Sequence, residues 1–302
     1  MSLHLPKRRT VVIVAAALVA LYAVISIAVA WVLTMGTHSA ISIAPASIAA
    51  QQDDVSFPSR EDHLTLRGWL FHAPASNGRS VIFVHGWQGN RVDTGSGLWQ
   101  KARDVVAHGY DALLFDLRSC GTSDGSRFTL ATDEPRDVLG AYDFMVQRGY
   151  AAGRMTILGV SMGASSMIEA APQLSHVGAL ISDSAFAELS PLIARELPKR
   201  SHLPGFLFDW GISTSARLIF GVDPDLRPVD VVRALPQRAF LFLQATNDDF
   251  VPTADSAELY RASGSPGSRI DLLSSDQHVK EYLAHPAAYM AAVYAFIDQQ
   301  VA

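Results

Sequence analysis

The chain has 302 residues, of which 49% are hydrophobic and 18% are charged, and its formal net charge is −5. This length is sufficient for one large α/β domain, and so low a charged fraction excludes an intrinsically disordered chain. The single cysteine, Cys120, excludes an internal disulfide framework and a cysteine-rich metal site. Beyond Lys7, Arg8 and Arg9 the chain is acidic, which argues against nucleic acid as a partner because phosphate binding needs clustered basic side chains.

A basic segment over residues 1–10 precedes an apolar run from Val11 to Leu33. A helix of that length, rising about 1.5 Å per residue, spans a hydrocarbon core of about 30 Å. Trp31 lies where an interfacial aromatic is expected, and basic residues before a span are typical of its cytoplasmic side. The sequence predicts a single-pass membrane anchor over 11–33 with the catalytic body outside the cytoplasm. A signal peptide cleaved near Ala28-Val29-Ala30 is the alternative, although its apolar region is unusually long.

Residues 34–54, rich in Ala, Ser and Ile, are predicted to form a tether, and residues 55–302 to form one domain. In that domain β-rich runs alternate with helical patterns, which predicts an α/β fold with a mostly parallel, doubly wound sheet. The stretch 186–233 contains no convincing strand and is predicted to be a helical insertion. The expected strands are an exposed early strand at 63–72 and buried strands at 80–84, 112–115, 155–158, 179–182, 239–243 and 269–273, followed by a helix at 286–297.

A serine on a sharp turn is the first sign of chemistry. Gly159-Val160-Ser161-Met162-Gly163 follows the strand at 155–158 and leads into a helix of small residues. This G-x-S-x-G pattern between a strand and a helix is typical of a nucleophile elbow, whose strained turn exposes the hydroxyl. The same letters recur around Ser123, but a polar, turn-like segment follows, so Ser161 is the predicted nucleophile.

A serine needs a general base, and a base histidine needs a carboxylate to orient it. His278 follows the last predicted strand after a short loop, whereas His285 precedes Pro286 at a helix start and is better explained as a surface residue. Asp248 and Asp249 both follow the strand at 239–243, and either is a candidate acid. Asp183 is a further candidate, although capping the start of the insertion is its simpler role.

Two backbone N–H groups are predicted to hold the oxyanion. Met162 begins the helix after the nucleophile, where the helix dipole favours negative charge. The turn His85-Gly86-Trp87 follows the strand at 80–84, and the N–H of Trp87 is the second donor.

Together these residues resemble the α/β-hydrolase superfamily, and in particular its serine-hydrolase branch with membrane-anchored bacterial esterase-like members. The resemblance rests on the HGWQGN turn, the DLRSCGTSDG loop, the GVSMG elbow, the NDDFVP loop and the late His278. It implies that the acid is Asp248, in a D-x-x-V-P arrangement, and that 186–233 forms a small lid. Ser119 departs from the family, whose members often carry glycine at that position.

The predicted function is hydrolysis of an ester, thioester or related acyl bond of a small-molecule substrate through an acyl-enzyme on Ser161. A serine peptidase acting on short peptides is one alternative; it would need an acidic pair in the lid, where Glu188 and Glu196 are the only glutamates. A non-catalytic, membrane-tethered interaction module is the other. The histidines lack metal-ligand spacing, so neither a metal nor a cofactor is expected.

Overall fold

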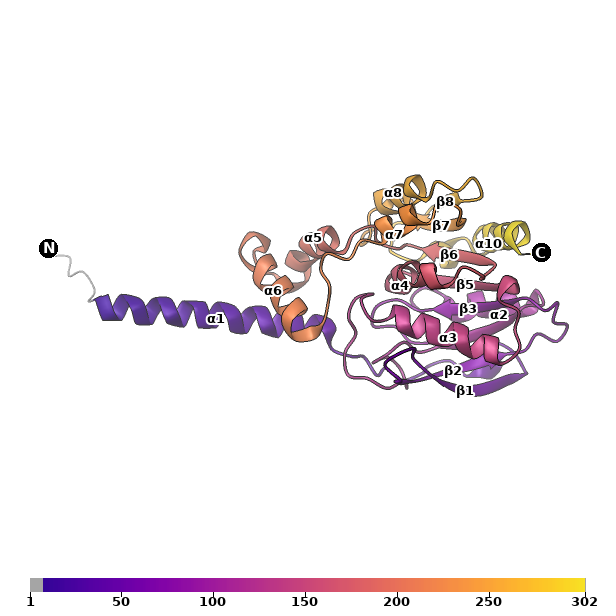
Figure 1. Cartoon of the computed structure of the whole chain (residues 1–302), viewed down its shortest axis with the longest axis horizontal. Coiled ribbons are helices and arrows are strands. Elements are labelled where there is room, and N and C mark those ends of the chain that lie inside the picture. Colours follow the sequence, from indigo (N-terminus) through magenta and orange to yellow (C-terminus); the bar gives the residue numbers. More distant parts are fainter. Residues whose placement is uncertain (1–7, 302) are drawn as a thin grey trace.

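The computed structural model describes residues 8–301, which form an α/β body and one long helix that projects from it (Figure 1). The helix α1 (Arg8–Thr34) is apolar and long enough to cross a membrane, properties that a signal sequence near an N-terminus shares. Its orientation in a membrane is not determined by the fold. Of the predicted basic segment 1–10, residues 1–7 lie outside the described part of the chain.

The body is built on one sheet of eight strands in the order β1-β2-β4-β3-β5-β6-β7-β8. The pairs β1–β2 and β2–β4 are antiparallel, and all the others are parallel, which confirms the predicted mostly parallel α/β fold. The strands are β1 (Gln52–Pro58), β2 (Thr65–Phe71), β3 (Ser80–Val84), β4 (Asp111–Phe115), β5 (Met155–Val160), β6 (Ala179–Asp183), β7 (Phe240–Ala245) and β8 (Arg269–Leu273).

Helices cover both faces of this sheet. Along β3, Ile82 and Val84 pack against the face that carries α3, α4, α7 and α8, while Val81 and Phe83 pack against the face that carries α2, α9 and α10. Burial on both faces explains why the central strands are continuous apolar runs. The helices are α2 (Leu98–Ala107), α3 (Pro135–Gln147), α4 (Met162–Ala170), α5 (Leu189–Ser201), α6 (Gly205–Phe220), α7 (Pro228–Ala234), α8 (Thr253–Ser263), α9 (Glu281–Ala284) and α10 (Pro286–Gln300), with 3₁₀ turns η1 (Pro45–Ser47), η2 (Ala152–Arg154) and η3 (Ala171–Gln173).

Strand β1 was not predicted, and the prediction that its neighbour β2 is exposed is wrong. β1 pairs along its whole length with β2, so β2 is an inner strand and is largely buried rather than exposed. Only Val55 and Phe57 of β1 are buried, because the strand lies at the edge of the sheet. Two apolar residues next to two aspartates give too short an alternation to predict a strand.

The predicted tether is not a free linker in this structure. The N–H groups of Gly36 and Thr37 donate to the carbonyls of Ser126 and Ser119 at 3.0 and 2.8 Å, and Ile48 is buried. The ring of His38 also bonds the loop carbonyls of residues 121 and 125. These backbone pairings fasten residues 35–51 to the body, and no sequence pattern indicates them.

The stretch 186–233 forms helices α5, α6 and α7, and its described residues contain no strand. Helix α7 packs on the body, with Val229 and Val232 fully buried, so only α5 and α6 stand apart from the sheet (Figure 1). Helix α6 lies beside α1: the rings of Tyr22 and Phe208 stack with centroids 5.2 Å apart. The Tyr22 hydroxyl donates to the carbonyl of Leu207 at 2.9 Å.

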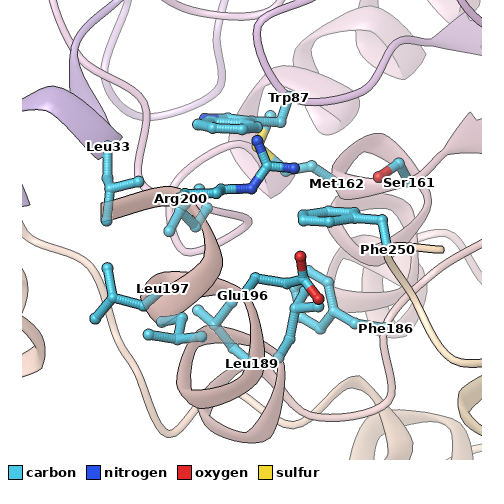
Figure 2. A pocket seen from close by; sticks show the side chains of 13 residues that line it. Leu33, Trp87, Ser161, Met162, Phe186, Leu189, Glu196, Leu197, Arg200 and Phe250 are labelled. Atoms are coloured by element: carbon cyan, nitrogen blue, oxygen red, sulfur yellow. The ribbon is translucent and has the colours of Figure 1, made fainter. Parts of the chain in front are cut away.

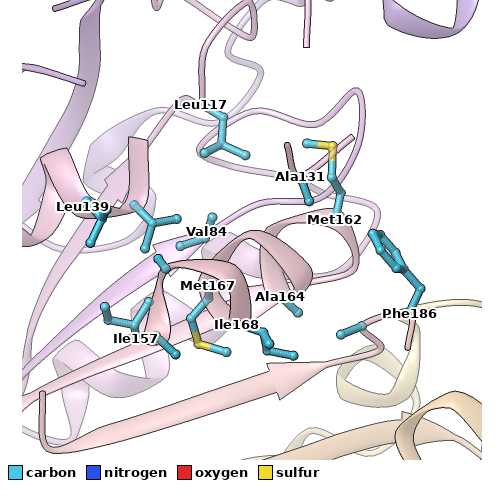
Figure 3. Packing of buried hydrophobic residues seen from close by; sticks show 14 of the residues in the cluster. Val84, Leu117, Ala131, Leu139, Ile157, Met162, Ala164, Met167, Ile168 and Phe186 are labelled. Atoms are coloured by element: carbon cyan, nitrogen blue, oxygen red, sulfur yellow. The ribbon is translucent and has the colours of Figure 1, made fainter. Parts of the chain in front are cut away.

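Helix α4 is the most buried helix of the body and fixes the turn that precedes it. Figure 3 shows Ala164, Met167 and Ile168 of α4 packed among side chains of the strands and of α3, including Ile157 and Leu139. A helix held on all sides in this way gives the residue at its N-terminus a rigid position.

Candidate active site

Ser161 occupies the sharp turn between β5 and α4. Its backbone has φ 54° and ψ −120°, a conformation that is strained for a residue with a side chain. Two features maintain this strained conformation. The N–H of Ser161 donates to the carbonyl of Asp183 at 2.7 Å, and the buried helix α4 follows directly. The hydroxyl therefore faces the cleft above the carboxyl ends of the parallel strands.

The two glycines of the elbow are required by close packing. A Cβ on Gly163 would lie 2.4 Å from the carbonyl oxygen of His85, and one on Gly159 would lie 2.5 Å from the Cα of Ala164. Neither neighbour is a flexible side chain, so any larger residue displaces backbone. The G-x-S-x-G pattern thus has a direct steric cause.

Ser161, His278 and Asp248 form a continuous hydrogen-bonded chain. The Nε2 of His278 lies 2.7 Å from the Ser161 hydroxyl, and its Nδ1 lies 2.8 Å from Oδ2 of Asp248. The Asp248 side chain is fully buried, whereas the ring of His278 keeps some exposure. An Nδ1–H that donates to the carboxylate leaves Nε2 free to accept the serine proton.

The carboxylate of Asp248 is held by groups other than the histidine. Its Oδ1 accepts the N–H groups of Phe250 and Val251, each at 2.8 Å, and its Oδ2 accepts the Gln244 amide at 2.7 Å. These donors satisfy a buried charge that would otherwise be costly. They also explain the spacing from Asp248 to Val251, because only a tight turn over these residues brings both backbone N–H groups to the carboxylate.

Asp249 has a different role from the one that its position in the sequence indicates. The sequence offers it as a candidate acid, but its carboxylate does not contact the His278 ring, and α8 begins at Thr253 with Pro252 as its capping residue. Instead Oδ1 of Asp249 accepts the backbone N–H of His278 at 2.8 Å. Asp248 therefore orients the imidazole ring, and Asp249 fixes the backbone that carries it.

Asp183, the other candidate acid, is engaged elsewhere, and the expectation that it caps the start of the lid is wrong. Its Oδ2 pairs with Nζ of Lys101 at 2.8 Å and accepts the hydroxyl of Tyr289 at 2.6 Å, and both Asp183 and Lys101 are fully buried. Glu281 lies next to this network, and burial together with the Asp183 charge raises its pKa to about 8. The network lies behind the elbow and away from the serine hydroxyl.

Ser123 is a structural residue. Its buried hydroxyl donates to the carbonyl of Asp116 at 2.6 Å and accepts the N–H of Arg67 at 2.9 Å. Ser119 in the same loop adopts φ 62°, a left-handed conformation that favours glycine, and its hydroxyl donates to the carbonyl of Arg127 at 2.5 Å. A local hydrogen bond thus accommodates a serine where glycine is expected.

The turn after β3 lies directly against the nucleophile. A Cβ on Gly86 would be 3.3 Å from the Cβ of Ser161. The ring of His85 fixes the conformation of this turn through two hydrogen bonds. Its Nε2 accepts the N–H of Leu117 at 3.0 Å, and its Nδ1 donates to the carbonyl of Gly86 at 2.8 Å. Complete burial lowers the pKa of His85, so the ring is neutral, as this pattern of one donor and one acceptor requires. Trp87 follows in the cleft.

An apolar pocket opens on one side of Ser161. Figure 2 shows Trp87 and Phe250 facing each other across it, with Arg200 between the two rings. The guanidinium carbon of Arg200 is 5.4 Å from the Trp87 ring and 4.7 Å from the Phe250 ring. The residues that line the pocket come from the elbow, the lid, the end of α1 and the loops that follow β3, β4 and β7; they are Leu33, Trp87, Leu130, Ser161, Met162, Phe186, Leu189, Leu192, Ile193, Glu196, Leu197, Arg200 and Phe250.

A polar cleft adjoins the apolar pocket and shares part of its lining. Its walls include the charged side chains of Asp93, Lys199, Asp249 and Lys280. Ser161 lines both the apolar pocket and this cleft. The nucleophile therefore lies at a boundary between an apolar and a polar environment.

The comparisons with known proteins agree with this fold. The family model described as "Alpha/beta hydrolase family" matches residues 81–298. The chain is 24% identical to YfhR of Salmonella typhimurium over 82% of both chains, and 23% identical to YqkD of Bacillus subtilis over 75% of this chain and 73% of that one. A solved structure of the Pyrococcus furiosus esterase Pf2001 superposes with a TM-score of 0.74 at 18% identity, covering 89% of this chain and 100% of the esterase.

Proposed function

The chain belongs to the alpha/beta hydrolase family, and we propose that it is a serine hydrolase that cleaves an ester, thioester or related acyl bond through an acyl-enzyme on Ser161. The observation that carries the proposal is the chain of hydrogen bonds from Ser161 through His278 to Asp248. Pf2001, a structural neighbour of this chain, is an esterase, which favours the same reaction class.

In the proposed reaction the Oγ of Ser161 attacks the acyl carbon while Nε2 of His278 takes its proton. The negative charge of Asp248 stabilises the imidazolium that forms. The carbonyl oxygen becomes an oxyanion, to which the N–H groups of Trp87 and Met162 donate hydrogen bonds; within the described residues neither N–H has another acceptor. His278 then protonates the leaving group, and water activated by the same histidine releases the acid.

The contacts of the lid glutamates favour an acyl ester over a peptide. A peptidase that recognises a free amino terminus needs acidic side chains available near the nucleophile. Glu188 pairs with Arg227 at 2.8 Å and does not line the pocket. Glu196 does line it, but its carboxylate pairs with Lys199 at 2.7 Å and with Arg195 at 3.0 Å. Only one lid glutamate therefore lines the pocket, and two cations already compensate its charge, so the lid does not present an acidic pair to a substrate amine.

We also propose that α1 anchors the protein in a membrane with the body outside the cytoplasm. The helix has the required length, and only 6% of its most apolar window is buried. Protease treatment of spheroplasts that carry an N-terminally tagged chain tests the orientation. Digestion of the body while the tag is retained supports the proposal, and protection of the body in intact spheroplasts reverses it.

Covalent labelling tests the proposed hydrolase against the non-catalytic interaction module. A fluorophosphonate probe should label the wild type and the Ser123→Ala variant, and should not label Ser161→Ala. Absence of labelling in the wild type would favour the module. Equal labelling of wild type and Ser161→Ala would show that the nucleophile is another residue.

A further inference from the structure

The two sides of Ser161 match the two ends of an amphiphile. One face of helix α5, from Leu189 to Leu197, lines the apolar pocket. Phe186 and Phe250 form the rest of the wall near it. The adjoining polar cleft, which also contains Ser161, carries acidic and basic side chains. An ester with a long acyl chain and a polar alcohol would place its carbonyl carbon at the boundary, where the serine lies.

The wall of the apolar pocket includes a residue of the long N-terminal helix. Leu33 is in the last turn of α1 and lines the pocket together with Leu197 of the lid (Figure 2). From Val11 to Leu21 helix α1 is apolar and exposed, and between Tyr22 and Ala30 it is covered on the side that faces α6. The pocket thus lies at the point where the proposed anchor meets the body.

Helix α6 extends the apolar surface of α1. Of its six exposed residues five are apolar, among them Phe206 (96% exposed), Trp210 (75%) and Leu218 (77%). The sixth, Arg217, pairs with Asp223 at 3.1 Å. So large a set of exposed aromatic and aliphatic side chains on one helix marks a surface that contacts something apolar.

The contacts between α6 and α1 determine how deep α6 would lie in the membrane that α1 crosses. Phe208 stacks on Tyr22, and Phe220 meets Trp31 edge-on with centroids 6.1 Å apart. From Tyr22 to Trp31 the helix rises about 13 Å, roughly half of a hydrocarbon core. The guanidinium carbon of Arg127 lies 3.7 Å from the centre of the Trp31 ring, and tryptophan is enriched at the membrane interface. With Trp31 at the interface, α6 lies within the leaflet nearest the body.

From this arrangement we propose that the substrate is a lipid ester of the surrounding membrane, whose acyl chain enters the apolar pocket from the leaflet that holds α6. The proposal rests on the proposed serine hydrolase activity and on the membrane anchor. Hydrolysis adds water across the acyl C–O bond, so that a fatty acid and the polar alcohol of the lipid are released. The occupant of the exposed face of α6 is therefore lipid, because this face continues the lipid-facing surface of α1.

The first test measures chain-length preference with the full chain in lipid nanodiscs. Two buried methylene groups already correspond to about a tenfold preference, so kcat/KM for 4-nitrophenyl dodecanoate should exceed that for the acetate by at least tenfold. Leu33→Trp fills the pocket and should lower the dodecanoate-to-acetate ratio by about tenfold. Val24→Trp, on the exposed side of α1, should keep the ratio. Equal rates on both esters in the wild type would overturn the proposal.

The second test measures whether α6 faces lipid and does not depend on activity. Brominated acyl chains quench tryptophans that lie in the hydrocarbon, and the chain has five tryptophans. Quenching of the wild type should fall markedly in Trp210→Phe and stay unchanged in the control Trp99→Phe, which lies on α2. Equal quenching in wild type and Trp210→Phe would place α6 in water or against a protein, including a second copy, and would overturn the proposal.

The two proposals fail in different ways. If the wild type hydrolyses neither ester and takes no fluorophosphonate label, the serine hydrolase proposal fails. If it hydrolyses the acetate through Ser161 but shows no preference for the long chain, only the lipid substrate is refuted.

Discussion

The exchange of Asp248 for asparagine tests the proposed catalytic chain most directly. The Oδ1 of Asp248 accepts two backbone N–H groups, so the amide oxygen of an asparagine keeps that position. Its NH₂ group then faces Nδ1 of His278, where the carboxylate Oδ2 lies in the wild type. An NH₂ donor holds the histidine proton on Nε2, so the nitrogen that faces Ser161 can no longer accept a proton.

The expected loss is about 10³- to 10⁴-fold in kcat, which corresponds to about 4–5.5 kcal/mol of transition-state stabilisation. Stability should fall much less. The amide of Gln244 faces the new NH₂ instead of an acceptor, and one lost hydrogen bond costs about 1 kcal/mol. The variant should therefore be folded and nearly inactive.

Asp249→Asn is the matched control. It retains an oxygen that accepts the backbone N–H of His278, so kcat should fall only a few-fold and the melting temperature slightly. Steady-state hydrolysis of 4-nitrophenyl acetate and thermal unfolding by circular dichroism measure both effects. The reasoning would be refuted if Asp248→Asn kept more than a tenth of the wild-type kcat, or if Asp249→Asn were the inactive variant.

Three further substitutions test the framework behind the nucleophile. Gly163→Ala should unfold the elbow or lower the melting temperature strongly, because its Cβ would overlap the backbone of Val84 and His85 at the end of β3. Gly153→Ala should change little, because its Cβ would have no heavy atom nearer than the carbonyl oxygen of His176 at 4.0 Å. Burial and the charge of Asp183 raise the pKa of Glu281 from 4.5 to about 8. Between pH 4.5 and about pH 8 the folded state therefore binds one more proton than the unfolded chain. Stability should fall as the pH rises through that window, and Glu281→Gln should flatten the melting temperature over the same pH range. Lys101→Met leaves the buried Asp183 carboxylate without its cation and should cost about 3–5 kcal/mol in urea unfolding, and a second exchange of Asp183 to Asn should recover part of the loss.

The fold could be predicted from the sequence wherever a strand is buried on both faces. The segments Val81–Val84 of β3 and Ala179–Ile181 of β6 are apolar throughout and fully buried. Strand β1 escaped prediction because an edge strand needs only every second residue to be apolar, and the run ends after Val55 and Phe57. Backbone hydrogen bonds to β2 stabilise β1, and such bonds do not depend on which residues the strand contains.

The site could be predicted where a local pattern has a steric cause. The glycines at positions 159 and 163 are dictated by contacts within the elbow, so the pattern indicates Ser161 directly. Asp249 and Arg200 could not be assigned in this way. The partner of Asp249 is 29 residues along the chain, and Arg200 lies between two rings that come from different loops. Only the folded chain brings such groups together.

The packing of α6 on α1 also bears on whether the N-terminal helix is retained. Cleavage near Ala30 would remove Tyr22 and Ser26, which lie against α6 at Gly211 and Phe208. Phe208 of α6 is buried and stacks on Tyr22, so loss of α1 would expose part of its ring at a cost of up to about 1.5–3 kcal/mol. We therefore expect the mature chain to keep α1, and mass spectrometry of the protein extracted from membranes measures this. A mature N-terminus near Trp31 would contradict the expectation, and with it the lipid-facing position of α6, because the helix that sets the depth of α6 would then be absent.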